Sequence, residues 1–146
     1  MVDNISKLPV KKAIALLIRS EENQGLVLGC LRLETDTSYP NMWGLPAGSL
    51  KDGEAEFELI DRIMIQKLRI KNYKIIRHLG KLTAPRQNKF LLILDEFEIL
   101  VESNQANCNL KEYQKCEFQD PSIFVETART GSLCTQICLN YFNIKY

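Results

Sequence analysis

Apolar residues along the chain follow two different spacings, which together predict a mixture of strands and helices. Runs rich in Ile, Val and Leu, each bounded by polar turn residues, predict strands. The first two strands are separated by the polar segment SEENQG, which predicts a hairpin. The predicted strands cover residues 11–19, 25–33, 73–83, 89–100 and 115–119.

One segment carries the helical spacing instead. Its apolar positions recur three or four residues apart and predict a helix over residues 54–71, with one stripe facing the core. These positions are Phe57, Ile60, Met64 and Leu68. Acidic residues crowd the start of this helix and basic residues its end, which suits the helix macrodipole. Asn72 is expected to close the helix in a left-handed conformation.

A long loop and a last helix complete the pattern. Residues 34–52 hold both prolines of YPNMWGLP and indicate an irregular loop, a kind of segment that is usually functional or mobile. Pro121 is expected to open a final helix. The apolar face of that helix would include Leu133, Ile137 and Tyr141.

Length and composition narrow the class of protein. We expect 146 residues to form one domain over residues 1–146, and 45% apolar with 25% charged residues is typical of a soluble globular protein. A net charge of +1 creates no field that would attract nucleic acid. The apolar run at residues 13–18 is too short to span a membrane. We therefore expect a cytoplasmic protein in which any phosphate recognition depends on a local cluster of cations.

The five cysteines form no CxxC pair and are odd in number, which argues against a disulfide framework and a zinc knuckle. We expect reduced thiols. Cys134 and Cys138 would share one face of the last helix, but no histidine or third cysteine stands beside them. Core packing is therefore favoured over metal binding for this pair.

A spaced motif follows the long loop. Gly48, Glu54 and Arg62 stand with five and then seven residues between them, at the start of the mostly apolar helix. This spacing resembles the first half of the Nudix box, and Met64 and Ile70 fill the two aliphatic places of that motif.

The surroundings agree with the resemblance. YPNMWGLPAG is similar to the family's tryptophan and Pro-Gly lead-in, and LGCLRL to the strand whose last arginine, here Arg32, often faces the substrate. CEFQDPSIF resembles the segment before the family's last helix, with Glu117 and Phe118 in its Glu and aromatic places. The resemblance implies an α/β (α+β) fold, a Nudix-like α/β/α sandwich. Its mixed central sheet would carry the box helix and the C-terminal helix on opposite faces.

The second half of the box departs from the family pattern. The resemblance implies Mg²⁺ or Mn²⁺ held by helix glutamates, but Ile63, Gln66 and Lys67 stand in those places. These residues cannot form the usual metal cage, so no cofactor is expected. Arg69 replaces the box glycine, and a left-handed cap disfavours arginine, so we expect the helix to continue towards Asn72.

On a regular helix, the face that would carry the metal ligands retains one carboxylate. It comprises Glu56, Leu59, Ile63, Gln66, Lys67 and Ile70. Glu56 lies two turns from Ile63, about 10 Å along the axis, and cannot simply replace a glutamate there. An acid near a helix N-terminus also has an ordinary structural explanation.

Three functional hypotheses follow. The first is a Nudix-fold protein with a degenerate box, inactive in metal-dependent hydrolysis, which binds a protein partner or a nucleotide-like, diphosphate-containing ligand through Arg32, Gly48 and Lys67. The second is an active hydrolase of a nucleoside diphosphate-linked substrate. It would hold Mg²⁺ or Mn²⁺ through Glu56, Glu117 and a backbone carbonyl near Gly48. The third is a structural or interaction module whose apolar helix face meets a partner or fills the cleft.

Three side chains admit both a structural and a functional interpretation, and we favour the structural one for each. Lys67 is either a solvated cation at the helix end or an ammonium that replaces the charge of the metal and holds a phosphate. Trp43 either packs or stacks on a base. His78, the single histidine, is either an ordinary strand residue without a visible partner or a general base.

Overall fold

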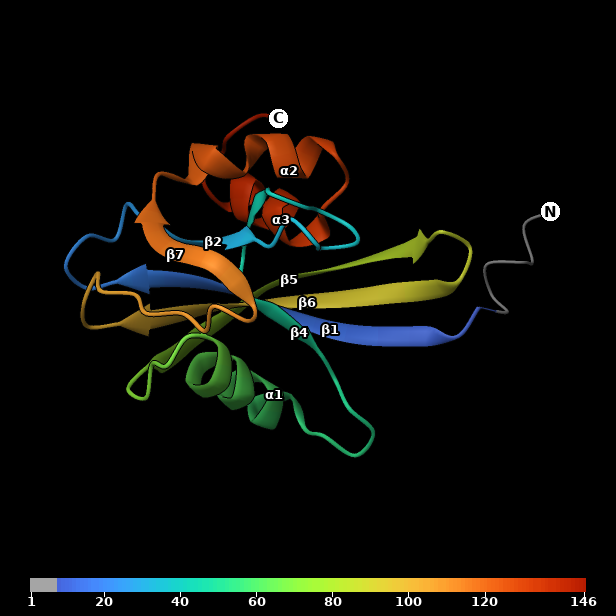
Figure 1. Cartoon of the computed structure of the whole chain (residues 1–146), viewed down its shortest axis with the longest axis horizontal. Coiled ribbons are helices and arrows are strands. Elements are labelled where there is room, and N and C mark those ends of the chain that lie inside the picture. Colours follow the sequence, from blue (N-terminus) through green and yellow to red (C-terminus); the bar gives the residue numbers. More distant parts are fainter. Residues whose placement is uncertain (1–7) are drawn as a thin grey trace.

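The computed structural model describes residues 8–146. Its centre is a four-stranded mixed sheet in the order β4-β1-β6-β5 (Figure 1). Strands β1 and β6 are parallel, and the other neighbours are antiparallel. The strands are β1 (Val10–Ser20), β4 (Ala47–Ser49), β5 (Lys74–Arg86) and β6 (Phe90–Val101).

A second sheet and two groups of helices complete the fold. The second sheet is antiparallel, in the order β3-β2-β7, and comprises β2 (Val27–Arg32), β3 (Trp43–Gly44) and β7 (Tyr113–Gln119). Helix α1 (Glu56–Arg62) continues into the π-helical turn η2 (Ile63–Lys67). The C-terminal group contains η3 (Pro121–Phe124), α2 (Val125–Arg129) and α3 (Leu133–Tyr141).

Figure 1 shows α1 on one side of the mixed sheet and α2 and α3 on the other. The expected sandwich, with the box helix and the C-terminal helix on opposite faces, is therefore confirmed. No helix within residues 8–146 has the length and apolar character that crossing a membrane requires.

Strand β1 is buried on both of its faces, and this positions both groups of helices. Its residues 13–18 are all buried, and alternate side chains enter different clusters because successive strand residues point to opposite faces. Ile14, Leu16 and Ile18 pack with the α1 side, whereas Ala13, Ala15 and Leu17 pack with the α3 side.

The predicted hairpin between the first two strands is wrong. Strand β1 pairs with β4 and β6, whereas β2 pairs with β3 and β7 in the other sheet. A strand buried on both faces is typical of a sheet interior with a parallel neighbour. Strand β6, far away in sequence, supplies that neighbour.

Two other expectations need correction. The supposed irregular loop at residues 34–52 contains β3 and β4, which are too short, at two and three residues, to show an alternating strand pattern, and β4 forms the edge beside β1. The last helix is also interrupted. Gly131 adopts φ +105° between α2 and α3, a conformation that glycine enters without a steric cost.

The box helix ends earlier than the sequence predicts. Arg69 itself takes the left-handed conformation, with φ +58°, so the helix stops and Asn72 is not its cap. The chain turns back as Ile70 N donates to Met64 O at 2.9 Å. Phe57 also leaves the predicted core stripe, because its side chain is 68% exposed, while Ile60, Met64 and Leu68 are buried as expected.

Two carboxyl groups of β6 are buried on the α3 side. Arg19 Nη1 and Arg77 Nε lie 2.9 and 2.8 Å from the two oxygens of Glu98. Glu96 has no hydrogen-bond partner within the described chain, and its complete burial raises the pKa of this carboxyl well above the usual range. Burial therefore favours the protonated form of the Glu96 carboxyl.

The left-handed Arg69 gives a direct test of the helix end. Replacing it with glycine, Arg69→Gly, is expected to raise the free energy of unfolding by about 1 kcal/mol, because glycine adopts this conformation without the clash of a Cβ. Urea denaturation measures the change. The control Arg69→Ala removes the same charge but keeps the Cβ, so an equal gain from alanine would contradict the explanation.

Candidate functional site

The strand β4 and the helix α1 approach each other at Gly48. A Cβ at this position would lie 3.0 Å from Leu59 Cδ1 and 3.4 Å from Ile63 Cγ1. These distances leave little room for a side chain, so Gly48 serves the close packing of the helix on the strand. Strand β4 in turn pairs with β1, which fixes this contact relative to the core.

Glu54 and Arg62 clamp the loop that enters the helix. The Nε and Nη2 atoms of Arg62 donate to the two carboxylate oxygens of Glu54, both at 3.0 Å. Arg62 Nη2 also donates to Ser49 O at 2.9 Å, and Lys51 N donates to Glu54 Oε1 at 3.0 Å. The hydrogen bond from Arg62 and that from Lys51 N lower the pKa of Glu54 to about 2. The matched residues of the box thus hold the loop and helix together.

The first family ligand position is part of the core. Ile63 is fully buried and packs in the same cluster as Leu59, Met64 and, at its edge, Ile70. The predicted apolar helix face therefore fills the interior, and it is not available to a partner. The other ligand positions lie apart, since Gln66 is exposed and Lys67 turns inward.

Lys67 is a tethered, largely buried cation. Its Nζ donates to Ala47 O at 2.5 Å and lies 3.9 Å from Glu112 Oε2, and its side chain is 17% exposed. Its backbone oxygen accepts from Asn109 N at 2.8 Å. Burial lowers the pKa of the ammonium; nearby Arg32 and Arg62 lower it further, and Glu112 opposes them. The interpretation that we favoured for Lys67, a solvated cation at the helix end, is therefore wrong.

This donor set does not suit Mg²⁺ or Mn²⁺, which bind hard oxygen ligands. The Lys67 ammonium already donates to the carbonyl of Ala47, and the buried alkyl chain of Ile63 stands at the first ligand position. Both Glu56 and Glu117 are exposed. Within residues 8–146, no three His, Cys, Asp or Glu side chains come together in an arrangement able to hold a metal.

Arg32 ends strand β2 beside this cation. Its Nη1 lies 3.3 Å from Asp36 Oδ1, and its guanidinium stands 5.8 Å from the centre of the Tyr39 ring. Gly44 of the neighbouring strand lies next to this side chain, since a Cβ there would be in ordinary contact with Arg32 Nε at 3.6 Å. Gln114 donates to Arg32 O at 2.8 Å.

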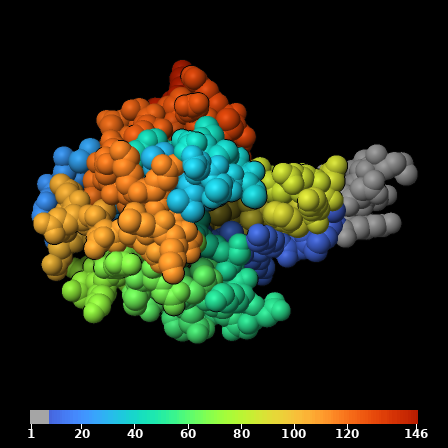
Figure 2. All heavy atoms as spheres, in the orientation of Figure 1, coloured from blue at the N-terminus to red at the C-terminus, as the bar shows by residue number. Residues whose placement is uncertain are grey.

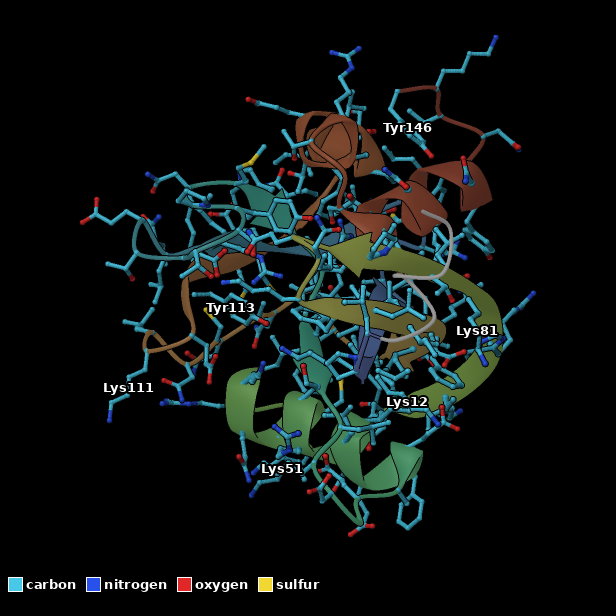
Figure 3. All side chains as sticks on the ribbon, turned by 90° about the vertical axis from the view of Figure 1, so that its right-hand side faces the viewer. Lys12, Lys51, Lys81, Lys111, Tyr113 and Tyr146 are labelled. Atoms are coloured by element: carbon cyan, nitrogen blue, oxygen red, sulfur yellow. The ribbon has the colours of Figure 1, made fainter. Side chains whose placement is uncertain are left out.

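The sequence analysis did not single out several of these partner residues. Asp36 accepts hydrogen bonds from Ser38 N and Tyr39 N, a turn that its Asp-Thr-Ser sequence could have indicated. Glu112 and Tyr113 had no such sequence pattern. Tyr113, labelled in Figure 3, is buried in the cluster between β7 and α1.

The other candidate residues do not share the contacts of Lys67 and Arg32. Trp43 precedes Gly44 in β3 and so points to the opposite side of the strand from Arg32, where its ring faces Gly29 and the Lys115 ammonium. Glu117 lies with Lys115 and Gln119 on the exposed part of β7. His78 does have a partner, because its Nε2 lies 2.7 Å from Asp95 Oδ1 on the central sheet.

All five cysteines are buried and unpaired. Cys134 and Cys138 pack with the α3 cluster, as expected. Cys30 and Cys116 face each other across β2 and β7, with 3.3 Å between their sulfur atoms. Hydrogen bonding to Cys30 and burial raise the pKa of the Cys116 thiol, which keeps it protonated.

Comparisons of sequence find no matching family model and no matching curated protein. Comparisons of structure find clear likeness. The MutT protein from Methanosarcina mazei Go1 is 17% identical, with a TM-score of 0.72 over 95% of this chain and 99% of that chain. The C. elegans Ap4A hydrolase, in a binary complex, is 16% identical, with a TM-score of 0.68 over 91% and 98%.

A third similar structure is the NUDIX domain of Shewanella oneidensis NrtR complexed with ADP ribose. It is 10% identical, with a TM-score of 0.65 over 93% of this chain and 90% of that chain. At such identities the likeness concerns the fold alone. The chain has the Nudix fold, as its motif predicted.

Restoring the first family ligand is expected to damage the fold. The substitution Ile63→Glu places a carboxylate in the core without a partner and should lower the free energy of unfolding by about 3–5 kcal/mol. The control Gln66→Glu, at an exposed position, should change it by less than about 0.5 kcal/mol. Chemical denaturation compares the two, and equal effects would mean that Ile63 is not a core residue.

The Glu54–Arg62 clamp predicts a specific dependence on pH. Because the pKa of Glu54 falls from its ordinary 4.5 to about 2 on folding, its contribution is complete above about pH 5 and is lost as the pH decreases towards 2. The stability difference between the wild type and Glu54→Gln should therefore disappear over this range. Denaturation at several pH values measures it, and a difference that persists at pH 2 would contradict the role of the clamp.

Proposed function

We propose that this chain is a Nudix-fold protein that binds a nucleotide-like, diphosphate-containing ligand without a metal ion and does not hydrolyse it. The observation that carries the proposal is the contact between Lys67 Nζ and Ala47 O, 2.5 Å long. This contact holds a cation of the chain itself in the site. It also uses a carbonyl near Gly48 that the metal-dependent alternative would need.

Lys67 and Arg32 form the anion-binding part of the proposed site. Both side chains are only partly exposed, so their charges are less screened than those of surface lysines. Each has one weak carboxylate neighbour, Glu112 at 3.9 Å and Asp36 at 3.3 Å. A diphosphate could replace these carboxylates, since the planar guanidinium and the compact ammonium both donate to phosphate oxygens.

The absence of hydrolysis follows from the same residues. A Nudix-type reaction needs a metal ion to polarise phosphorus and to generate hydroxide. Ile63, Gln66 and Lys67 supply no ligand for this ion, and Lys67 repels it. The proposed role is therefore recognition of a ligand.

The ligand class is supported by the fold. The NrtR domain was solved with ADP ribose, and the C. elegans relative is named an Ap4A hydrolase, so nucleotides linked through phosphates suit this architecture. Five buried, unpaired cysteines suit a reducing compartment, and we propose the cytoplasm.

Calorimetry with ADP-ribose in EDTA and in millimolar Mg²⁺ tests the binding proposal. We expect equal affinity in both solutions. Lys67→Met should lower the affinity by about 10- to 100-fold, the effect of losing one charged hydrogen bond, and Lys67→Arg should restore part of it. The exposed Lys71→Met serves as control and should bind like the wild type. Affinity that appears only with Mg²⁺ would contradict the proposal.

The ammonium also predicts how binding depends on pH. Because burial lowers the pKa of Lys67 below its ordinary 10.5, its charge is lost earlier than that of an exposed lysine as the pH increases. The affinity of the wild type should therefore decrease on the alkaline side, before pH 10.5 is reached. The Lys67→Arg variant should keep its affinity there, since arginine stays charged.

A separate assay tests the lack of hydrolysis. Nucleoside triphosphates, dinucleoside polyphosphates and nucleotide sugars are incubated with the protein in Mg²⁺ or Mn²⁺. We expect no turnover above the background. A rate above about 1 s⁻¹, ordinary for an enzyme, would overturn this part of the proposal, particularly if Lys67→Glu did not increase it.

A further inference from the structure

Glu96 of β6 is one of two carboxyl groups buried on the α3 side of the central sheet. It is fully buried, and neither of its oxygens has a hydrogen-bond partner within residues 8–146. Glu98, two residues along on the same face, instead meets Arg19 at 2.9 Å and Arg77 at 2.8 Å. A buried polar group without a hydrogen bond costs free energy, and an isolated charge costs far more. Of the two carboxyl groups, Glu96 is therefore the one whose burial requires a proton.

Small residues make room for this carboxyl between the sheet and α3. Ala15 of β1 and Gly80 of β5 are the partners of Glu96 in the strand register. A Cβ at Gly80 would lie 3.8 Å from Ile137 Cγ2, so α3 lies directly over this part of the sheet. The Glu96 side chain is thus enclosed between three strands and one helix.

Helix α3 offers no cation to this carboxyl. Its residues 133–141 include no charged side chain. Burial, and after it the nearby Glu96 carboxyl, raises the pKa of the Cys134 and Cys138 thiols, which lie on the buried face of the helix. Tyr141, at the end of α3, donates its hydroxyl to Glu98 at 3.3 Å. An ionised Glu96 would therefore face thiols and apolar side chains.

Basic side chains around this part of the sheet have other partners. Arg19 and Arg77 contact Glu98, His78 and Lys81 contact Asp95 on the other face of β6, Arg32 contacts Asp36, and Arg86 donates to Gly131 O. Lys11 lies over the Phe90 ring, and Lys12 and Lys74 are exposed. Pairing Glu96 with one of the bound cations would break a contact that already exists. Protonation is the simpler way to keep this carboxyl uncharged in the interior.

Helix α3 is the layer of this enclosure that we expect to open first. It is the last helix, and the C-terminal helices, coloured orange to red, form the upper surface of the molecule in Figure 2. Gly131 separates α3 from α2. The strands on either side of Glu96 are joined to β6 by backbone ladders along their length. Terminal elements open locally at a lower free energy than paired strands of a core.

We propose that Glu96 is a pH-sensitive switch for α3: the protonated carboxyl allows the helix to pack on the sheet, and release of its proton to water detaches the helix. The carboxylate then becomes hydrated and no longer faces Cys134 and Cys138. The α1 layer, on the other side of the sheet, stays closed. The switch uses none of the residues of the candidate ligand site, so it does not rest on the proposed function.

The direction of the pH effect follows from burial. Burial raises the pKa of Glu96 well above its ordinary 4.5. The closed form therefore has its full stability below pH 4.5 and loses it as the pH increases towards the raised pKa. Over this interval the ratio of open to closed α3 should increase about 10-fold for each pH unit.

The buried cysteines can report this opening separately for each face of the sheet. Cys134 and Cys138 lie in the α3-side cluster, whereas Cys30, Cys108 and Cys116 lie in the α1-side cluster. Detachment of α3 alone exposes only the first two thiols to a reagent in solution. Unfolding of the whole chain exposes all five.

Pulsed alkylation with iodoacetamide, measured at each cysteine by mass spectrometry from about pH 6 to about pH 9, tests the switch. Each rate is divided by that of the same cysteine in the urea-unfolded chain at the same pH, which removes the ordinary titration of the thiol. The corrected rates of Cys134 and Cys138 should increase at least about 10-fold, while those of Cys30 and Cys116 stay constant. No increase, or equal increases at all cysteines, would overturn the proposal.

Substitutions of Glu96 separate its charge from its packing. Glu96→Gln has the same size but cannot ionise, so the corrected rates of Cys134 and Cys138 should no longer depend on pH. Glu96→Leu also removes the buried polar atoms and should protect both thiols at least as well. The matched control is Glu102→Gln, at an exposed carboxylate just after β6, which should behave like the wild type. A pH dependence that persists in Glu96→Leu, with folding verified by circular dichroism, would overturn the role of Glu96.

Discussion

Burial of β1 on both of its faces is the constraint on which the rest of the structure depends. Ile14, Leu16 and Ile18 can leave water only if a layer covers one face of the sheet, and Ala15 and Leu17 require a layer on the other. Helix α1 supplies the first layer and α3 the second. Because β4 pairs with the same strand, its carbonyl groups and Gly48 are placed directly against the helix that carries the box.

The close approach at Gly48 links packing to chemistry. With no side chain on the strand, Leu59 and Ile63 move against β4, and the helix is near enough for Lys67 to reach the carbonyl of Ala47. Replacing a carboxylate with isoleucine at position 63 removes a buried charge that would need a metal or another partner. The lysine at position 67 then supplies a positive charge from the chain itself. The buried alkyl chain of Ile63 and the tethered ammonium of Lys67 thus belong to one packing arrangement.

Two faces of α1 therefore have different roles. Its inner face packs in the core, and Lys67 just beyond it donates to Ala47 O. The Glu54–Arg62 clamp holds the start of the helix. Its outer face retains exposed apolar side chains beside acidic ones, so its surface is not that of an ordinary solvated helix. The widened turn over Ile63–Lys67 and the left-handed Arg69 end the helix between these two environments.

The amino-acid sequence by itself determined the class of fold and the position of the box, because these depend on local spacing. The run of Gly48, Glu54 and Arg62 and the apolar stripe of the helix are properties of neighbouring residues. All five predicted strands also appear close to their expected positions, as β1, β2, β5, β6 and β7. That the second half of the box is unsuited to a metal stays a prediction from residue types.

Only the tertiary structure decided the pairing of the strands, the helix end and the partners of the charged side chains. The first two strands separate because β6, distant in sequence, is the better neighbour for a doubly buried strand. Arg69 adopts a conformation that local preference disfavours, since the packing of Leu68 and Ile70 directs the chain there. Lys67 looked like a solvated cation because its partner, Ala47 O, lies twenty residues away and belongs to the backbone, which no residue pattern reveals.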